Sequence, residues 1–229
     1  MALKRDIVGV VPVKDMSLAK TRLSARYTPE FRRHLAAVML EDVLTALIGS
    51  GVLADVALVT IDPVARAMAR KWGARVIDEG ARDGHTGAIV AAARRLCATH
   101  AGILTVPGDI PLATPAEVKL LVEGHASAPA FSIVPAHDNR GSNAVIMTPM
   151  TAVPLAFGND SFEPHIAAAR RQGIEPRIVR MAGIGLDIDH PDDLTSLMAA
   201  PSATHTWAFL AEQGLVQTLS SSRPQAVAS

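Results

Sequence analysis

Short apolar runs alternate with helical patterns along this chain of 229 residues. Residues 7–13 form one continuous apolar run, and residues 103–106 form another that contains β-branched side chains. Such runs are typical of parallel strands that are buried on both faces. Because short connections join the runs to the helical patterns, the sequence predicts an α/β fold. We expect a single domain with a mixed, mostly parallel sheet flanked by helices.

Local signals place the expected elements. Strands are predicted at residues 7–13, 55–61, 75–77, 103–106, 130–135, 144–148 and 174–181. Helices are predicted at residues 29–49, 63–73, 84–99, 115–124, 162–173 and 191–198. The pattern breaks down after residue 200, which predicts one domain over residues 1–200 and a C-terminal extension over 201–229. In that extension we expect a short helix at 207–215 and a disordered polar stretch at 220–229.

Charge and composition narrow the class of protein. The 22 basic residues balance 22 acidic ones, so neither nucleic acid nor a membrane surface is expected as the main partner. No apolar run reaches membrane-spanning length, and the first residues do not resemble a signal peptide. Cys97, the only cysteine, excludes an internal disulfide and is interpreted as a small buried side chain. These features predict a cytoplasmic protein.

An acidic residue follows a central strand directly. Pro107 and Gly108 end the strand at 103–106, and Asp109 comes next. Ligands of open α/β sheets bind at the carboxyl ends of the strands, and carboxylates there commonly hold Mg²⁺ on nucleotide phosphates. The alternative is that Asp109 only caps a turn.

A basic cluster follows the first strand. Lys14, Lys20 and Arg22 lie in the loop at residues 14–23. They are interpreted as a phosphate clamp, because lysine supplies a point charge and arginine a fork of donors. The loop is not a P-loop, since it lacks the glycine-rich sequence that ends in Gly-Lys-Ser/Thr. A solvated basic loop is the alternative.

A second acidic segment lies near the end of the predicted domain. In an extended segment, Asp187 and Asp189 point the same way and Ile188 points to the opposite side. Two such carboxylates repel each other unless a cation or a proton lies between them, so the pair favours a metal. Asp192 and Asp193 are interpreted as capping residues at the start of a helix.

Three further polar segments are candidate ligand contacts. Gly84 and Gly87 flank His85 and Thr86 at a helix start, where a base or ribose could approach the backbone. The loop at residues 137–143 carries many hydrogen-bonding groups, although turn formation is an alternative role. Ser161 is a predicted N-cap, and free N–H groups at a helix start attract anions.

Taken in order, these motifs resemble one enzyme family. The motifs are Pro12-Val13-Lys14, Ala19-Lys20-Thr21-Arg22-Leu23, Pro107-Gly108-Asp109-Ile110-Pro111, Gly141-Ser142-Asn143-Ala144, Phe157-Gly158 with Ser161, and Asp187-Ile188-Asp189 with Pro191. They look like those of the guanylyltransferases of coenzyme F420 biosynthesis, over roughly residues 7–198. Members of this family are named for 2-phospho-L-lactate, phosphoenolpyruvate or 3-phospho-D-glycerate as acceptor.

The resemblance implies a nucleotide-diphosphosugar-transferase-like, Rossmann-like fold and a role for each motif. By this resemblance, Mg²⁺ would be held by Asp109, Asp187 and Asp189. GTP would contact Pro12, Val13, Lys14, Lys20, Arg22, Gly84, Thr86, Pro107 and Gly108. The catalytic residues would be Lys14, Lys20, Arg22 and Asp109, and the acceptor would contact Asn143, Gly158 and Ser161.

This chain departs from the family pattern at two of these motifs. The family often has Gly-Leu-Asn where Gly84-His85-Thr86 stands, which leaves the recognition of guanine open. It often has threonine at the position of Ser142, which keeps a hydroxyl.

The implied reaction is transfer of GMP from GTP to the phosphate of a phosphorylated three-carbon acid, with release of pyrophosphate. A phosphomonoester is largely ionised at neutral pH, since its second pKa is about 6, so no general base is needed. The partners are then GTP, Mg²⁺ and a small acid, and a homodimer is the candidate assembly. Two alternatives stay open: another nucleotidyltransferase of this fold, of molybdenum-cofactor or sugar-nucleotide type, and a non-catalytic nucleotide-binding module.

Overall fold

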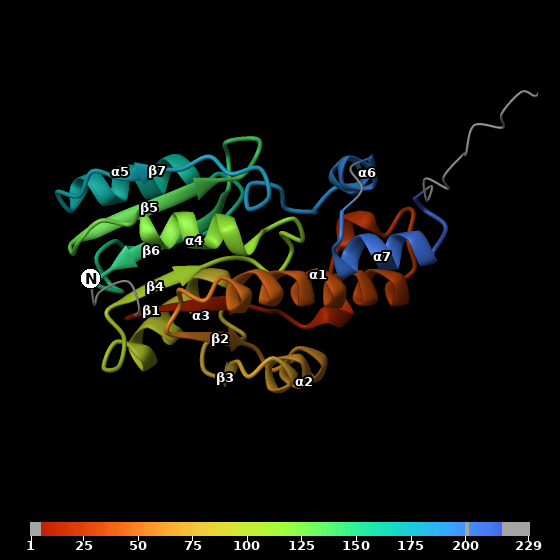
Figure 1. Cartoon of the computed structure of the whole chain (residues 1–229), viewed down its shortest axis with the longest axis horizontal. Coiled ribbons are helices and arrows are strands. Elements are labelled where there is room, and N and C mark those ends of the chain that lie inside the picture. Colours follow the sequence, from red (N-terminus) through yellow and green to blue (C-terminus); the bar gives the residue numbers. More distant parts are fainter. Residues whose placement is uncertain (1–5, 200–201, 217–229) are drawn as a thin grey trace, which may run out of the picture.

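A single seven-stranded sheet forms the centre of the protein, shown in Figure 1 as a computed structural model that describes residues 6–199 and 202–216. The strands are β1 (Ile7–Pro12), β2 (Asp55–Val59), β3 (Arg75–Ile77), β4 (Gly102–Thr105), β5 (Ala130–Pro135), β6 (Ser142–Thr148) and β7 (Arg177–Ile178). The α-helices are α1 (Pro29–Gly49), α2 (Pro63–Lys71), α3 (Gly84–Leu96), α4 (Pro115–Glu123), α5 (Phe162–Arg171), α6 (Pro191–Ala199) and α7 (His205–Glu212).

The sheet is mixed and mostly parallel, as predicted. Its strand order is β3-β2-β1-β4-β6-β5-β7. β1 pairs in parallel with β2 and β4, and β6 pairs antiparallel with both β4 and β5. β6 therefore runs against the other strands. The start of β6 lies at the same edge of the sheet as the carboxyl ends of β1 and β4.

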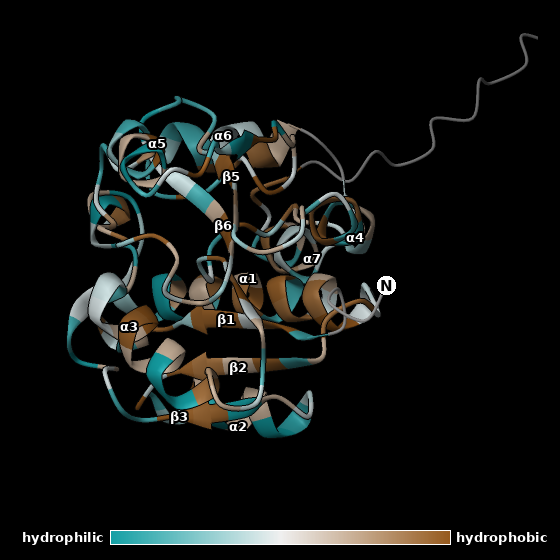
Figure 2. Ribbon diagram, turned by 90° about the vertical axis from the view of Figure 1, so that its left-hand side faces the viewer, coloured by the Kyte–Doolittle hydropathy of each residue, from teal (hydrophilic) through white to brown (hydrophobic). Residues whose placement is uncertain are grey.

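Helices cover both faces of the sheet and form two apolar cores. On one face, side chains of α1, α2 and α4 pack with those of β1, β2 and β4. On the other face, α3 and α5 pack against alternate residues of the same strands. β1, β2 and β3 are correspondingly coloured mostly as hydrophobic in Figure 2, where α2 shows a hydrophilic outer side. The continuous apolar runs in the sequence are explained by this burial on both faces.

A third apolar cluster joins the end of the chain to the rest of the fold. Phe209 and Leu210 of α7 are buried together with Leu35 and Met39 of α1. Asp42 of α1 fixes the start of α7, since its carboxylate accepts hydrogen bonds from the backbone N–H groups of His205 and Thr206 at 2.7 and 2.9 Å. The predicted domain boundary at residue 200 stays a prediction, and the expected disorder of 220–229 lies outside the described residues.

Side chains cap the starts of α1, α2 and α4. The hydroxyl of Thr28 accepts a hydrogen bond from the N–H of Phe31, and Pro29 is the first residue of α1. The carboxylate of Asp62 caps α2, and the hydroxyl of Thr114 caps α4. These contacts satisfy N–H groups that have no partner within a helix.

Several predicted boundaries are wrong. The strand predicted at 174–181 is reduced to Arg177 and Ile178, because only these two residues pair with the neighbouring β5. β6 begins two residues earlier than predicted, at Ser142, which moves Asn143 from the loop into the strand. α3 ends at Leu96 rather than 99, and α7 spans 205–212 rather than 207–215. Cys97, predicted to be buried, is exposed, because it follows the last residue of α3 and does not belong to the packed face of that helix.

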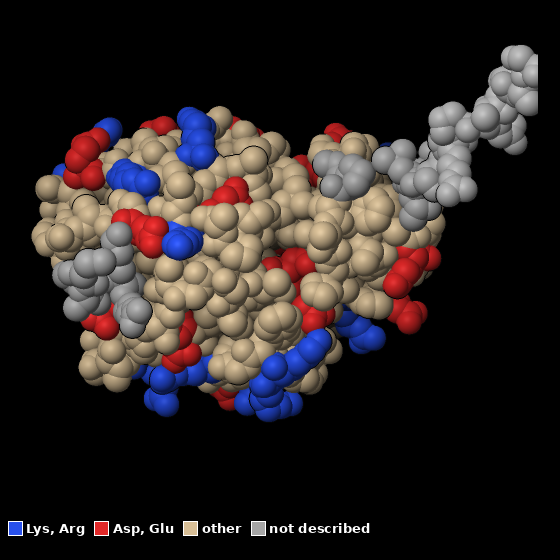
Figure 3. All heavy atoms as spheres, viewed as in Figure 1, with Lys and Arg blue, Asp and Glu red and all other residues tan. Residues whose placement is uncertain are grey.

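Charged side chains are dispersed over the face of the protein that Figure 3 presents. Acidic and basic side chains are interspersed there, in keeping with the balanced composition. Among the described residues, no helix has the length and apolarity needed to cross a bilayer.

Candidate active site

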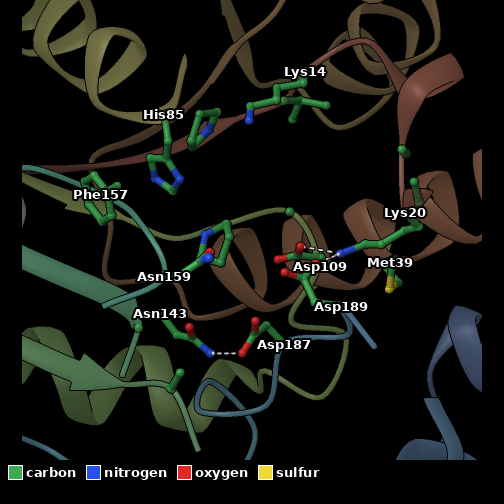
Figure 4. Close-up of a pocket in the computed structure, with 18 of the residues that line it drawn as sticks. Lys14, Lys20, Met39, His85, Asp109, Asn143, Phe157, Asn159, Asp187 and Asp189 are labelled. Atoms are coloured by element: carbon green, nitrogen blue, oxygen red, sulfur yellow. Dashed lines mark hydrogen bonds and ion pairs between the residues drawn. The ribbon is translucent and has the colours of Figure 1, made fainter. Parts of the chain in front are cut away.

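A cleft of about 880 Å³ opens where β1 and β4 end and β6 begins. It brings together most of the predicted site residues. Those that line it are Pro12, Val13, Lys14, Lys20, Arg22, Gly84, Pro107, Gly108, Asp109, Asn143, Gly158, Ser161, Asp187 and Asp189. Figure 4 shows Lys14 and His85 on one side of this cleft and Asn143 and Asp187 on the other. The sheet topology explains the convergence, because three strand ends meet at this edge.

The basic loop is anchored from several sides. It contains two short 3₁₀ helices that were not predicted, η2 (Met16–Leu18) and η3 (Thr21–Leu23). The carboxylate of Asp62 accepts a hydrogen bond from the N–H of Met16 at 3.0 Å, and the guanidinium of Arg32 donates to the carbonyl of Ala19 at 2.8 Å. The loop is therefore a fixed part of the cleft wall.

Lys20 lies between two carboxylates. Its Nζ is 2.5 Å from Oδ2 of Asp109 and 2.9 Å from Oδ1 of Asp189, and its side chain is only 7% exposed. Burial alone would lower the pKa of Lys20, but the charges of Asp109 and Asp189 outweigh it and raise this pKa above its ordinary value. Lys20 is therefore a charged ammonium that holds two acidic segments together.

Arg22 extends this ion-pair network toward solvent. Its Nη1 is 2.8 Å from Oδ2 of Asp189. Burial acts to raise the pKa of Asp189, whereas the charges of Lys20 and Arg22 lower it, and the net pKa is below the ordinary value. The carboxylate of Asp193 accepts hydrogen bonds from the N–H groups of Asp189 and His190, so Asp193 caps the start of α6 as interpreted from the sequence.

Asp187 is the carboxylate of this group that forms no ion pair with a described residue. Its Oδ1 accepts a hydrogen bond from Nδ2 of Asn143 at 3.0 Å. Burial raises the pKa of Asp187, and the nearby charges of Asp109 and Asp189 raise it further. Ile188, between the two aspartates, is fully buried on the opposite side. The cleft thus holds more negative charge at Asp187 than its own residues neutralise.

The three aspartates do not form a complete metal-binding set as they stand. Within residues 6–199 and 202–216, no group of three His, Cys, Asp or Glu side chains has the required closeness. The ammonium of Lys20 lies between Asp109 and Asp189, where it acts as a cation supplied by the chain. The donors themselves are carboxylate oxygens, which suit Mg²⁺.

Asn143 and Ser161 use their donors within the protein. Nδ2 of Asn143 donates to the carbonyl of Ile184 as well as to Asp187, each at 3.0 Å, so both of its N–H groups are engaged. The hydroxyl of Ser161 does not cap α5 and instead donates to Oγ of Ser142 at 3.2 Å. Asn143 or Ser161 can therefore donate a hydrogen bond to the predicted acceptor substrate only if it gives up a hydrogen bond within the protein.

Thr86 does not line the cleft, in contrast to the prediction. Its Oγ1 accepts a hydrogen bond from the N–H of Phe157 at 2.9 Å, which ties α3 to the segment before Gly158. His85 does line the cleft and stacks on the ring of Phe157, with centroids 4.0 Å apart. Gly84 begins the helix with φ +72°, a conformation that glycine adopts without strain.

Sequence reasoning gave no site role to Ser142, which lines the cleft, or to His165, which contacts Ser142 but does not itself line the cleft. Oγ of Ser142 is 3.0 Å from Nδ1 of His165. His165 follows Ser161 by four residues and so lies on the same face of α5. This spacing, together with the serine in the preceding polar loop, was the available signal.

Comparison with known proteins places the chain among nucleotidyltransferases. The family described as "Guanylyl transferase CofC like" matches residues 7–227. The chain is 37% identical to a phosphoenolpyruvate guanylyltransferase of Rubrobacter xylanophilus, over 85% of this chain and 95% of that protein. It is 31% identical to a 2-phospho-L-lactate guanylyltransferase of Methanothermobacter thermautotrophicus, over 88% of each.

A solved structure shares the fold. A protein of Desulfovibrio desulfuricans G20, described as a nucleotide-diphospho-sugar transferase, superposes with a TM-score of 0.70. It is 19% identical, over 91% of this chain and 95% of that one. The predicted fold class is confirmed.

Proposed function

The chain belongs to the CofC-like guanylyltransferase family, and we propose that it transfers GMP from GTP to the phosphate of phosphoenolpyruvate in coenzyme F420 biosynthesis. The relative from Rubrobacter xylanophilus supports this acceptor, because it carries that name and reaches 37% identity. 2-Phospho-L-lactate, named in the relative from Methanothermobacter thermautotrophicus, is the second acceptor to test.

One observation carries the proposal at the level of the site. The cations Lys20 and Arg22 and the carboxylates Asp109, Asp187 and Asp189 converge on one cleft, although they come from three distant segments. Joining two anionic substrates requires charge neutralisation and alignment, and this cleft supplies groups of both signs. A module that only binds a nucleotide has no need of three convergent aspartates.

The reaction proposed for this cleft balances without a protein base. An ionised oxygen of the acceptor phosphate attacks the α-phosphorus of GTP, and the bond between the α-phosphorus and the bridging oxygen breaks. Pyrophosphate leaves with the electron pair, and a diphosphate-linked guanosine product forms. Because the attacking oxygen is already deprotonated near neutral pH, catalysis rests on positioning and electrostatics.

Cations from the basic loop bind the triphosphate in this proposal. Lys14 is exposed at the cleft and free to reach a phosphate, whereas Lys20 and Arg22 exchange their carboxylate partners for phosphate oxygens. A divalent cation held by Asp109, Asp187 and Asp189 would neutralise phosphate charge and release Lys20 for this exchange. The uncompensated charge at Asp187 supports that assignment.

The remaining predicted contacts are proposed for the two substrates. Backbone at Pro12, Val13, Gly84, Pro107 and Gly108 lines the cleft beside the cations and is proposed to contact GTP. Asn143 lies on the opposite side from Lys14 in Figure 4, and Gly158 and Ser161 line the same cleft; these three residues are proposed, with Ser142, as the acceptor subsite. Asn143 also fixes Asp187, which links this subsite to the acidic cluster.

A pyrophosphate-release assay tests the function. The purified protein is incubated with GTP, Mg²⁺ and each of phosphoenolpyruvate, 2-phospho-L-lactate and 3-phospho-D-glycerate. We expect the fastest release with phosphoenolpyruvate, and a product that contains guanosine and the acceptor. Binding of GTP without release for any acceptor would favour the nucleotide-binding module.

A further inference from the structure

The protonation of His165 is fixed by a backbone amide. His165 is 1% exposed, and its Nε2 lies 3.0 Å from the backbone nitrogen of Ala156 in a hydrogen bond that the amide donates. An N–H group can only donate, so Nε2 must carry the lone pair. Burial also lowers the pKa of His165 to about 4, which keeps the ring neutral near pH 7. The single ring proton therefore resides on Nδ1.

The Nδ1 proton determines the direction of the next hydrogen bond. Nδ1 lies 3.0 Å from Oγ of Ser142, so His165 donates and Ser142 accepts. The hydroxyl of Ser161 donates to the same oxygen at 3.2 Å. A hydroxyl oxygen accepts two hydrogen bonds, so both lone pairs of Ser142 are used within the protein.

The proton of Ser142 is left for the cleft. Within the described part of the chain, the only hydrogen-bond partners of the Ser142 hydroxyl are His165 and Ser161, and both donate to it. The Ser142 proton therefore has no acceptor among the described residues. Ser142 is 8% exposed, and it lines the cleft next to Asn143 and Gly158. An oriented hydroxyl donor in this place suits an anionic oxygen, such as a carboxylate or phosphate oxygen of the acceptor.

We propose that His165 is the positioning residue of the acceptor subsite. Its Nδ1–H group donates a hydrogen bond to Oγ of Ser142, so that the hydroxyl proton of Ser142 is presented to an anionic oxygen of the substrate. This inference rests on the proposed function and specifies how the subsite is preorganised. His165 does not touch the substrate and takes no part in proton transfer.

The same ring also fixes the segment that ends in Gly158. The hydrogen bond from Ala156 anchors that segment to α5, and the ring of Phe157 packs edge-on against His165 with centroids 4.9 Å apart. Phe157 in turn stacks on His85. His165 therefore has two separable functions, one toward Ser142 through Nδ1 and one toward the Ala156 segment through Nε2.

Two amide substitutions separate these functions. In His165→Asn the amide nitrogen can take the place of Nδ1 and donate to Ser142, but nothing reaches Ala156. In His165→Gln the longer side chain can accept from Ala156, but the donor to Ser142 is lost. The Michaelis constants for acceptor and GTP are measured for both variants, together with melting temperatures.

A positioning role predicts a split between the two constants. In His165→Gln we expect the acceptor constant to rise about ten-fold or more while the GTP constant changes less than about three-fold, because a donor to a charged group is misoriented. In His165→Asn, which keeps a donor to Ser142, the acceptor Michaelis constant should stay within about three-fold of that of the unmodified enzyme. Equal acceptor constants in the two variants, with lowered melting temperatures, would show that His165 only packs the core and would overturn the inference.

A spectroscopic measurement tests the tautomer without turnover. Nitrogen-15 NMR of the unmodified protein at pH 7, with His165→Gln used to assign the signal, should show a protonated Nδ1 and an unprotonated Nε2. A proton on Nε2 would overturn the inference even if the enzyme is active. Absence of turnover with every acceptor would contradict the proposed function and remove the substrate role of Ser142, whereas an active enzyme with the other tautomer contradicts only the role of His165.

Discussion

The two sides of the cleft hold their polar groups by different means. On the acidic side, Asp109 and Asp189 share the ammonium of Lys20, and Asp187 has no cationic partner among the described residues. On the neutral side, Ser142 and His165 are buried, and each has its hydrogen bonds directed by a fixed backbone or ring donor. In the proposed reaction, the first arrangement exchanges partners when charged substrates enter. In the second, the hydroxyl proton of Ser142 is already oriented, so a substrate oxygen that accepts it displaces no protein group.

This contrast predicts that changes on the acidic side act on turnover and on binding of the nucleoside triphosphate, whereas changes on the neutral side act on acceptor binding. Charge–charge interactions in a half-buried site are individually strong, so their loss has the larger effect. A hydrogen bond to a charged group is worth about 1.5–3 kcal/mol.

The largest effect is expected for Asp109→Asn. Asp109 contacts Lys20 and is one of the three proposed metal ligands, so its loss removes charge that aligns the triphosphate. Metal-ion stabilisation contributes several kcal/mol, so kcat should fall by about a hundred-fold or more. Steady-state pyrophosphate release at ordinary Mg²⁺ concentrations measures the effect. Asp192→Asn, an exposed change at the start of α6, is the control with near-normal activity. Near-normal activity of Asp109→Asn itself would refute the metal assignment.

Lys20→Met tests the exchange of partners. Lys20 sees only phosphate in the proposed complex, so the Michaelis constants for GTP and ATP should both rise about ten-fold. Without the ammonium, Asp109 and Asp189 repel each other, and the melting temperature in EDTA should fall by roughly 2–6 °C. Added Mg²⁺ should then raise the melting temperature of the variant more than that of the unmodified protein. A change in base preference alone, or no gain from Mg²⁺, would contradict this role.

Ser142→Ala and Ser161→Ala compare two members of the neutral side. Ser142 has the free proton and Ser161 donates to Ser142, so the acceptor Michaelis constant should rise about ten-fold in Ser142→Ala and less in Ser161→Ala. The GTP constant should change little in both. Because Ser161 does not cap α5, its substitution should cost less than the roughly 1 kcal/mol typical of a lost N-cap. A larger effect of Ser161→Ala on the acceptor constant would reverse the assigned order.

The parts of this picture that the sequence predicted depend on local patterns. The apolar runs at β1 and β4 predict buried strands, and Asp109 directly follows one of them. Proline after a capping side chain located the starts of α1 and α2. Such signals involve neighbouring residues, so one sequence is sufficient to read them.

The parts that were missed depend on distant contacts or on direction. Lys20 meets Asp109 across 89 positions and Asp189 across 169, so their ion pairs leave no local signal. The sequence also contains no sign that the carbonyl of Ile184 and the carboxylate of Asp187 take both N–H groups of Asn143, whose predicted contact with the acceptor stays a prediction. The direction of a hydrogen bond depends on atoms of the folded backbone, as the amide of Ala156 shows for His165.

The smallest expected effect is on the stability of the protein at acidic pH, and it concerns His125. This buried histidine shows what burial alone does, without a role in acceptor binding. His125 is buried between Ser132 and Thr148, and Thr148 ends β6 at the edge of the sheet opposite the cleft. Burial, with the nearby charge of Arg177, lowers the pKa of His125 to about 4. In the unfolded chain the pKa of a histidine is about 6.5. Between about pH 4 and pH 6.5 the unfolded chain therefore binds more protons than the folded protein. The contribution of His125 to stability is therefore complete above about pH 6.5 and is lost as the pH falls toward 4.

His125→Asn should make the melting temperature less dependent on pH between 6.5 and 4 by a few degrees at most, because one of several buried histidines no longer has to charge on unfolding. The acceptor Michaelis constant of this variant should stay within about two-fold, since His125 has no contact with the cleft. His165 has its pKa lowered to about 4 by burial as well, but it contacts Ser142, so its substitution by glutamine should change both quantities. Melting curves over this pH range, measured beside acceptor kinetics at pH 7, give the comparison. An acceptor constant that shifts equally in His125→Asn and His165→Gln would mean that buried histidines act on the subsite through general stability, and the distinction between a preorganised subsite and the rest of the core would not hold.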